Sequence, residues 1–327
     1  MRWGPVTRED ARPLADFWAA LEAEDRTGEV HSLDDVTEQL AHPRIDLATG
    51  TLAAWEGDRI VALGYLPARQ AADETHTMRL WGGVHPAHRR RGHGRRVVDW
   101  AIRTAPGLSE RAFPGVPLEL HLHVSDGNPG LAVLAESSGM TAVRTFARME
   151  RGLAGEPPTL RPPEGLEIAT WTPELDDGAR HVRNESFRDH WGSVPHTRES
   201  WRDHLIDSHN FRPESSFVAL AGDQAVGVLI THDFGTPGLR QAWIQVIGTL
   251  KEWRGRGVAG ALVAHALAAF KEQGYESAGL GVDTENPTGA VSVYTRAGFA
   301  ISRRSRTYAL YLPQREARDE SGAGVHE

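Results

Sequence analysis

The sequence predicts an α+β protein that contains two copies of one domain in tandem. Two motifs recur in the same order at nearly the same spacing: the motif at 89–94 returns at 254–259, and the motif at 128–140 returns at 286–299. A stretch with four prolines, 153–163, separates the copies and is typical of a semi-rigid linker. Within each half, strand-like and helix-like periodicities alternate. A duplicated domain explains all three observations.

Length and composition agree with two globular domains. The chain has 327 residues, of which 40% are hydrophobic and 24% charged, so each half is long enough to bury its own core. The predicted parts are an N-terminal domain at 1–152, a linker at 153–163, a C-terminal domain at 164–313 and a tail at 314–327. The tail is polar, lacks periodicity and is expected to be disordered.

The first half is expected to alternate strands with two helices. Apolar and β-branched runs predict strands at 51–55, 60–66, 77–84 and 118–124. Helical spacing predicts helices from about 94 to 103 and around 131–137.

The second half follows the same order. Strands are predicted at 216–220, 225–230, 241–250, 280–282 and 307–312, and helices at 257–271 and 288–296. Gly222-Asp223 is a hairpin-turn signal between the first two of these strands. Gly274 is expected to cap the end of the helix at 257–271.

Charge and cysteine content exclude several kinds of function. The net charge of -8 disfavours nucleic acid and anionic lipid as partners, and the basic run 85–96 lacks the interleaved aromatics of a nucleic-acid binder. Without cysteine the chain has no disulfide, no thiolate zinc site and no acyl-cysteine intermediate. There is no apolar membrane span and no signal-like N-terminus. We therefore expect a cytoplasmic protein.

Both copies of the glycine motif follow an apolar strand and open an amphipathic helix. The first-turn amides of a helix have no intrahelical partner, and the helix dipole is positive at that end. Glycines also let the backbone approach a phosphate closely. One such loop is weak support because many turns look like it, but two copies in the same context favour a pair of phosphate sites.

These residues resemble the acyl-CoA pyrophosphate loop of the GNAT acetyltransferases, at 84–94 and again at 248–259. The segment 282–299 resembles the Asn-Ala-Tyr-Gly-Phe segment of the same family. The resemblance covers about residues 1–312 and is more specific in the second half. It implies two tandem GNAT domains, each with a mixed, mostly antiparallel sheet flanked by helices.

The resemblance also implies acetyl-CoA as co-substrate, held where two neighbouring strands diverge. In the second half, Ile247 and Thr249 would face the pantetheine, and Asn286 would lie near the thiol. The pyrophosphate would be held by Arg254, Gly255, Arg256, Gly257, Val258, Ala259 and Gly260. The matching residues of the first half are Val84, Arg89, Arg90, Gly92, His93 and Gly94.

Tyr294 is the candidate general acid. When an amine attacks a thioester the leaving group is a thiolate, and a phenol with a pKa of about 10 is able to protonate it. The alternative is an ordinary core tyrosine. The first half has Ala135 at the equivalent position, and alanine donates no proton. We therefore expect the first domain to be non-catalytic, either binding CoA without turnover or serving as a structural partner.

A general base is less clear, because the strand at 241–250 contains no carboxylate. Asp283 and Glu285 are candidates that would act through a water molecule. Asp189 and His190 are others, on the segment expected to form the acceptor-side wall. The alternative for each is a solvated loop residue.

The segment 187–201 is rich in aromatic residues and histidines, and His190 and Trp191 are its candidate substrate contacts. The alternative is a helix face packed on the sheet. His121 and His123 share one strand face, but without a third ligand or a cysteine no metal site is expected.

The predicted function is acetyl transfer, in a ternary complex, to the amine of a small molecule. The negative net charge favours a cationic acceptor such as a polyamine, an amino sugar or an aminoglycoside-like molecule. Two alternatives stay open: a non-catalytic CoA-binding sensor or scaffold, and an acetyltransferase for peptides or proteins. The protein is expected to be a monomer or a homodimer.

Overall fold

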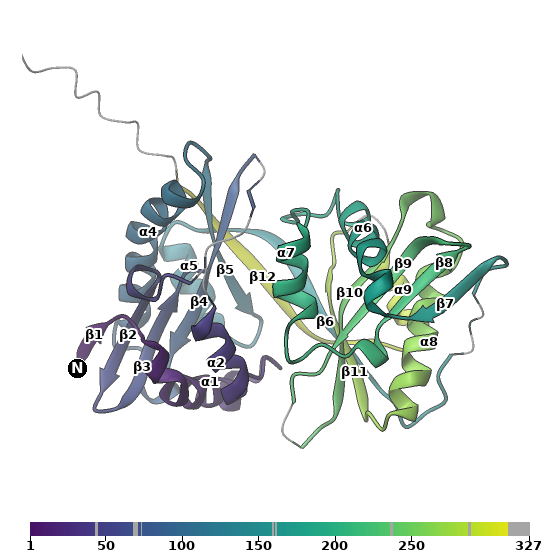
Figure 1. Cartoon of the computed structure of the whole chain (residues 1–327). Helices are drawn as coiled ribbons and strands as arrows, with labels where there is room; N and C mark the ends of the chain where they lie inside the picture. The colour runs from purple at the N-terminus through teal and green to yellow at the C-terminus, as the bar shows by residue number, and fades with distance from the viewer. Residues whose placement is uncertain are drawn as a thin grey trace, which may run out of the picture.

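The computed structural model describes residues 1–42, 45–67, 71–72, 74–158, 160, 162–235, 238–286 and 289–312. The predicted tail at 314–327 and Pro287 lie outside these residues. Twelve strands form one sheet in the order β1-β2-β3-β4-β5-β12-β6-β11-β10-β9-β8-β7. Figure 1 shows two lobes joined by the long strands β6 and β12.

The first half of the chain supplies six strands and five α-helices among the described residues. They are β1 (Arg2–Gly4), α1 (Ala11–Asp25), α2 (Leu33–Ala41), α3 (Leu47–Gly50), β2 (Thr51–Glu56), β3 (Arg59–Tyr65), β4 (His76–Val84), α4 (His93–Ala112), β5 (Leu118–Ser125), α5 (Pro129–Ser137) and β6 (Thr141–Gly152).

The second half repeats this order, with a π-helical turn after α7. Its elements are β7 (Leu166–Thr170), α6 (Asp176–Ser186), α7 (Arg198–Trp201), η4 (Arg202–Ile206), β8 (Phe217–Ala221), β9 (Gln224–His232), β10 (Gln241–Thr249), α8 (Val258–Glu272), β11 (Ser277–Asp283), α9 (Ala290–Arg296) and β12 (Ala300–Leu312).

The predicted α+β class with a mixed, mostly antiparallel sheet is confirmed. Only the pairs β4–β5 and β10–β11 are parallel among the described strands. The hairpin at Gly222-Asp223 is also confirmed, since Ala221 pairs with Gln224 and Gly222 has a φ of 58°. A left-handed φ of this kind costs glycine little.

Three differences from the sequence prediction concern α4, β12 and β6, and the elements β1, α1, α2, α3, β7 and α6 were also not predicted. Helix α4 continues through Pro106 to Ala112, because Ala105 and Leu108 keep its buried face going beyond the proline. Strand β12 begins at Ala300 instead of residue 307. Strand β6 was not predicted at all, although it pairs on both sides.

Strands β6 and β12 are exchanged between the halves. β12, the last strand of the second half, pairs over residues 305–312 with β5 of the first half, from Leu312↔Leu118 to Ser305↔Ser125. β6, the last strand of the first half, pairs with β11 of the second, from Ser277↔Gly152 to Asp283↔Phe146. The two strands also pair with each other. Each half therefore completes its sheet with a strand from the other.

The cores follow the same exchange. Ala147 and Met149 of β6 are about 1% exposed and belong to the core of the second half, with Val228, Leu262 and other apolar residues. Tyr308 of β12 belongs to the core of the first half. The sequence boundaries at 152 and 164 therefore separate chain segments whose side chains pack in one another's cores.

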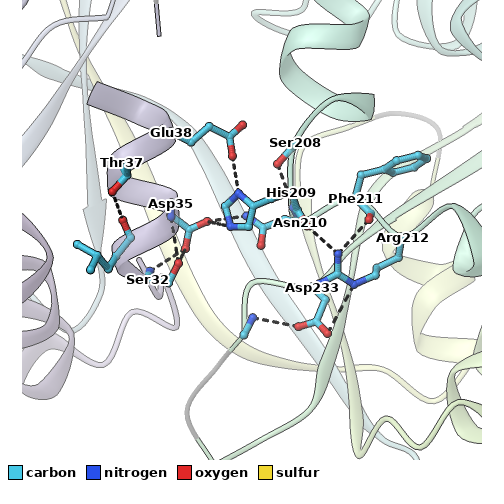
Figure 2. A network of polar contacts seen from close by, with 12 residues as sticks. Ser32, Asp35, Thr37, Glu38, Ser208, His209, Asn210, Phe211, Arg212 and Asp233 are labelled. Carbon is cyan, nitrogen blue, oxygen red and sulfur yellow. Dashed lines mark hydrogen bonds and ion pairs between the residues drawn. The ribbon is translucent and has the colours of Figure 1, made fainter. Parts of the chain in front are cut away.

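A polar network also joins the halves (Figure 2). His209 lies between two carboxylates of α2, with Nε2 3.2 Å from Asp35 Oδ1 and Nδ1 against Glu38. Asn210 Nδ2 donates to the same Asp35 oxygen at 2.6 Å. The network anchors the loop after η4 to the first half.

Among the described residues, no helix combines the length and apolar composition that crossing a membrane requires.

Candidate active site

A cleft opens in the second half where two parallel strands diverge. β10 and β11 pair only from Gln241↔Ser277 to Ile244↔Leu280, and a bulge interrupts the pairing of β10 with β9 between Ile244 and Val246. A bulge bends a strand and increases its twist. The cavity between the diverging ends, called here the second cleft, has a volume of about 590 Å³.

The second cleft reaches the glycine loop that precedes α8. Gly255 and Gly257 have φ values of 73° and 88°, and α8 begins at Val258 with Gly257 as its N-cap. The free amides of this helix start therefore lie at the cleft, beside the positive end of the helix dipole. Nine of the predicted cofactor residues line it: Ile247, Thr249, Arg254, Gly255, Gly257, Val258, Ala259, Gly260 and Asn286.

Arg256 is not among the residues that line the cleft. Its guanidinium lies 4.9 Å from the ring centroid of Trp253. Arg254 does line it, but its guanidinium donates to the carbonyl oxygens of Thr249 at 3.4 Å and Ser186 at 3.0 Å. Arg254 thus fixes the loop to β10 and to the end of α6.

Tyr294 lies on α9 and borders the second cleft. The side chain is buried, at 6% exposure. Burial raises the pKa of the phenol above its ordinary value. Tyr294 therefore stays protonated at neutral pH, as a proton donor must.

Two of the four candidate bases, Asp283 and Glu285, are held by an arginine of β6. Arg144 Nε donates to Asp283 Oδ2 at 2.9 Å, and Arg144 Nη1 lies 3.5 Å from Glu285 Oε2. Glu285 also accepts a hydrogen bond from the backbone N–H of Thr145 at 3.0 Å. Asp283 borders the cleft, whereas Glu285 does not. Both carboxylates thus join the end of β11 to β6.

Sequence reasoning missed the contribution of β6 to this cleft. Phe146, the neighbour of Thr145, lines the cavity together with Ser186 and Phe187 of the α6 end. Because β6 was not recognised as a strand, no pattern pointed to Phe146. Its pairing with Asp283 in the sheet places it there.

Of the two candidate contacts with the acceptor, only one borders the second cleft. His190 borders the second cleft, and its ring lies 5.2 Å from that of Phe187. Trp191 does not border it and instead stacks on His121 of β5, with ring centroids 5.2 Å apart and planes 2° apart. Trp191 also lies 6.2 Å from Phe146, so it covers the exchanged strands between the halves.

The paired histidines of β5 have protein partners. His121 Nε2 lies 3.0 Å from Glu119 Oε2. His123 contacts Thr307 Oγ1 at 3.1 Å and Ser305 Oγ at 2.6 Å, both on β12. In the described ranges, no group of three or more His, Asp or Glu side chains is arranged to hold a metal ion.

A matching cleft lies in the first half. β4 and β5 pair only from His76↔Leu118 to Leu80↔Leu122, and beyond this they border a cavity of about 460 Å³, the first cleft. Its lining includes the predicted residues Val84, Arg89, Arg90, Gly92, His93 and Gly94.

The loop of the first cleft is fixed in the same way as that of the second. Arg89 Nε donates to Val84 O at 3.1 Å, and its two terminal nitrogens donate to Asp25 of α1 at 2.8 and 2.6 Å. Gly92 is the N-cap of α4 with a φ of 83°. Arg90 adopts a φ of 62°, where the second loop has Gly255.

Among the described residues that line the first cleft, no tyrosine corresponds to Tyr294. Ala135 of α5 is fully buried and does not border the cavity. The first cleft does contain charged and aromatic residues that sequence reasoning missed, among them Trp18, His31 and Arg79.

Comparison with known proteins agrees with two similar domains in one chain. The family model described as the acetyltransferase (GNAT) family matches residues 15–129 and 177–299. The chain is 31% identical over 230 residues to a mycothiol acetyltransferase of Streptomyces avermitilis, covering 69% of each chain. It is 32% identical over 226 residues to one of Catenulispora acidiphila, covering 68% of each.

Solved structures show the same two-lobed arrangement. A GCN5-related N-acetyltransferase from Sphaerobacter thermophilus superposes with a TM-score of 0.77 at 25% identity, covering 95% of this chain and 96% of that one. A tandem GNAT protein from the clavulanic acid biosynthesis pathway superposes with a TM-score of 0.71 at 18% identity, covering 95% and 98%.

Proposed function

The chain belongs to the GNAT family of acetyltransferases, and from this premise we propose that its second cleft transfers an acetyl group from acetyl-CoA to the amine of a small cationic molecule. The observation that carries the proposal is Tyr294. A buried, protonated phenol borders a cavity that also reaches the free amides at the start of α8. The negative net charge of the chain favours a cationic acceptor.

The second cleft has the groups that an acyl-CoA needs. The amides from Arg254 to Gly260 would hold the pyrophosphate, as other helix starts hold phosphates. Thr249 Oγ1 is buried at the cleft and has no hydrogen-bond partner among the described residues. A buried hydroxyl is costly without a partner, so the amide-bearing pantetheine is a suitable one.

Acetyl-CoA supplies an acyl carbon activated by a sulfur leaving group. The backbone amides of β10 near Ile247 would stabilise the negative charge that develops on the acetyl oxygen. As the amine nitrogen bonds to the acetyl carbon and the carbon–sulfur bond breaks, the Tyr294 phenol gives its proton to the sulfur. The amine loses its proton through a water molecule to Asp283, the carboxylate that borders the cleft, and proton exchange with solvent then restores the Asp283 carboxylate and the Tyr294 phenol.

The acceptor is proposed to enter from the side of His190. This residue borders the cleft, and Phe146 adds an aromatic wall from β6. Since relatives at 31% and 32% identity are mycothiol acetyltransferases, the deacetylated form of mycothiol belongs among the acceptors to be tried, beside polyamines, amino sugars and aminoglycosides.

Calorimetric titration with acetyl-CoA followed by a thiol-release assay tests the proposal. We expect saturable binding, and release of free CoA thiol only when an amine acceptor is present. Binding without release for any amine or peptide would favour the sensor or scaffold alternative. Release only with peptides would favour the peptide acetyltransferase, and failure to bind at millimolar concentration would refute the proposal.

A further inference from the structure

Arg79 is a half-buried cation of the first cleft that forms no ion pair with any described residue. It lies on β4, opposite His121 of β5, and borders the cavity. Its guanidinium carbon is 3.6 Å from the ring centroid of Trp81. Its Nε is fully buried without a hydrogen-bond partner, and no ion pair joins Arg79 to another described residue.

The carboxylates around Arg79 are engaged elsewhere or too far to pair with it. Asp25 is bound by Arg89. Glu22 accepts hydrogen bonds from the backbone N–H groups of Thr27 and Gly28, both at 2.8 Å. Burial lowers the pKa of the Arg79 guanidinium, and the nearby charge of Glu29 opposes this only in part. The cation is thus left for a partner outside the chain.

Besides Glu29, His31 and His123 line the first cleft together with Arg79. Burial, and secondarily the charge of Arg79 itself, lowers the pKa of His123 to about 3. Burial also lowers the pKa of His31, whose ring lies 5.0 Å from that of Trp18. A desolvated arginine in such surroundings is costly unless an anion compensates it.

In the second cleft, each arginine among the described lining residues has a hydrogen-bond partner. His76 and Gln241 hold equivalent positions at the start of β4 and β10, since each pairs with the first residue of the next parallel strand. Three residues further on, the first half has Arg79 and the second has the buried Ile244. An apolar side chain therefore suits this position in the fold, and the arginine is not needed to build the sheet.

We propose that the first cleft binds a small organic acid, whose carboxylate pairs with the Arg79 guanidinium beside Trp81. A guanidinium presents Nε and a terminal nitrogen as a fork that fits both oxygens of a carboxylate. The carboxylate has two possible sources. It belongs to a free acid, or it ends the acyl group of a CoA thioester whose pyrophosphate lies on the Gly92 loop.

The test uses calorimetric titration of the full chain with succinate, benzoate, succinyl-CoA and acetyl-CoA. The variants are Arg79→Met and, as a matched control that removes one exposed arginine of α4, Arg103→Met. Binding of the carboxylates is expected to weaken at least about tenfold in Arg79→Met and to stay unchanged in Arg103→Met. Acetyl-CoA binding in the second cleft should be the same in all three proteins.

The four ligands distinguish a free organic acid from the carboxylated acyl group of a CoA thioester. Succinate or benzoate binding that depends on Arg79 indicates a free acid. A preference for succinyl-CoA over acetyl-CoA that disappears in Arg79→Met indicates a carboxylated acyl group. Equal affinity of wild type and Arg79→Met for every carboxylate would overturn the proposal. Because succinate does not require the second cleft, this result stands apart from the outcome for acetyl transfer.

Folding of the variant is tested separately. Since the unpaired cation is unfavourable in the ligand-free chain, Arg79→Met should melt no lower than the wild type. The more conservative Arg79→Lys keeps the charge without the fork, and we expect partial loss of carboxylate affinity. A large fall in Tm for both variants would assign Arg79 a structural role and contradict the proposal.

Discussion

The first and second clefts share a frame and differ in a few side chains. Each lies between diverging parallel strands and ends at a glycine N-cap fixed by an arginine, Arg89 or Arg254. The second cleft has the phenol of Tyr294 where the first has Ala135. The first half thus keeps the strands and the glycine loop of the second without the proposed proton donor.

The two clefts also differ at the position of Asp283, the carboxylate that borders the second cleft. Counting from the paired starts of β5 and β11, Val124 occupies the position of Asp283. Both are buried, at 4% and 3% exposure, but only Asp283 has an arginine partner. The first cleft instead has the unpaired cation Arg79. The two halves share one fold, but the second cleft has the carboxylate of Asp283 and the first has the guanidinium of Arg79, at non-equivalent positions.

The largest effect is expected from Arg144→Met. It leaves Asp283 buried without its cation, and breaking such a pair costs about 3 kcal/mol of unfolding free energy. Arg303→Met is the matched control, because Arg303 lies on β12, pairs with Arg148 in the sheet and has no such carboxylate. Urea unfolding measures both. Equal stability of the two variants would show that the ion pair contributes little.

Tyr294→Phe is expected to lower the turnover number about 10²-fold, since it removes the proton donor. Acetyl-CoA affinity should stay nearly unchanged. Ala135→Ser, at the equivalent position of the first half, should leave turnover as it is. Thiol release and calorimetry measure the two quantities, and wild-type turnover in Tyr294→Phe would remove the proposed role of the phenol.

Gly257→Val should weaken acetyl-CoA binding in the second cleft about tenfold. At a φ of 88° a β-branched residue is strained, and the amides of the loop would shift to relieve the strain. Gly92→Val, at a φ of 83°, imposes the same strain on the first cleft. Only Gly257→Val should raise KM for acetyl-CoA. A matching rise for Gly92→Val would mean that both clefts support turnover.

The smallest effect concerns pH. Burial lowers the pKa of His123 to about 3 and of His232 to about 4. The unfolded chain, with a histidine pKa near 6.5, then binds more protons than the folded one. Stability is fully present above about pH 6.5 and falls with decreasing pH, by up to about 1.4 kcal/mol per pH unit for each histidine.

Single His123→Gln and His232→Gln variants test this pH dependence, one in each half. Urea unfolding between pH 7 and 5 should show a shallower loss of stability in each variant than in the wild type. An unchanged slope for His123→Gln would mean that this histidine is protonated in the folded first cleft.

The sequence predicted most of the strands and both glycine loops, but not the exchange of β6 and β12 between the halves. Strands such as β3 and β9 are apolar, and the glycine loops carry a motif, so both were found. Strand β6 and the start of β12 contain arginines at 144, 148, 151, 303, 304 and 306, which hide the alternation of a strand. Their pairing comes from partners more than a hundred residues away, and no local pattern reports such partners.

The candidate site was also predicted only in part. The loop residues and Tyr294 lie around one cavity as expected, and their contact with acetyl-CoA stays a prediction. Phe146 and Arg144 were missed because they lie on β6. Arg79 was missed for a different reason: one arginine in an apolar strand resembles no motif, and only the cavity and the missing partner distinguish it.

Because β12 pairs with β5, the sheet of the first half stays incomplete until the end of the chain has been translated. On the ribosome, β5 is complete long before residues 300–312 appear, so its edge stays unpaired while the whole second half is translated. Open strand edges of this kind invite wrong partners and aggregation. A premature stop codon shortly before residue 300 would therefore damage the half that was translated first.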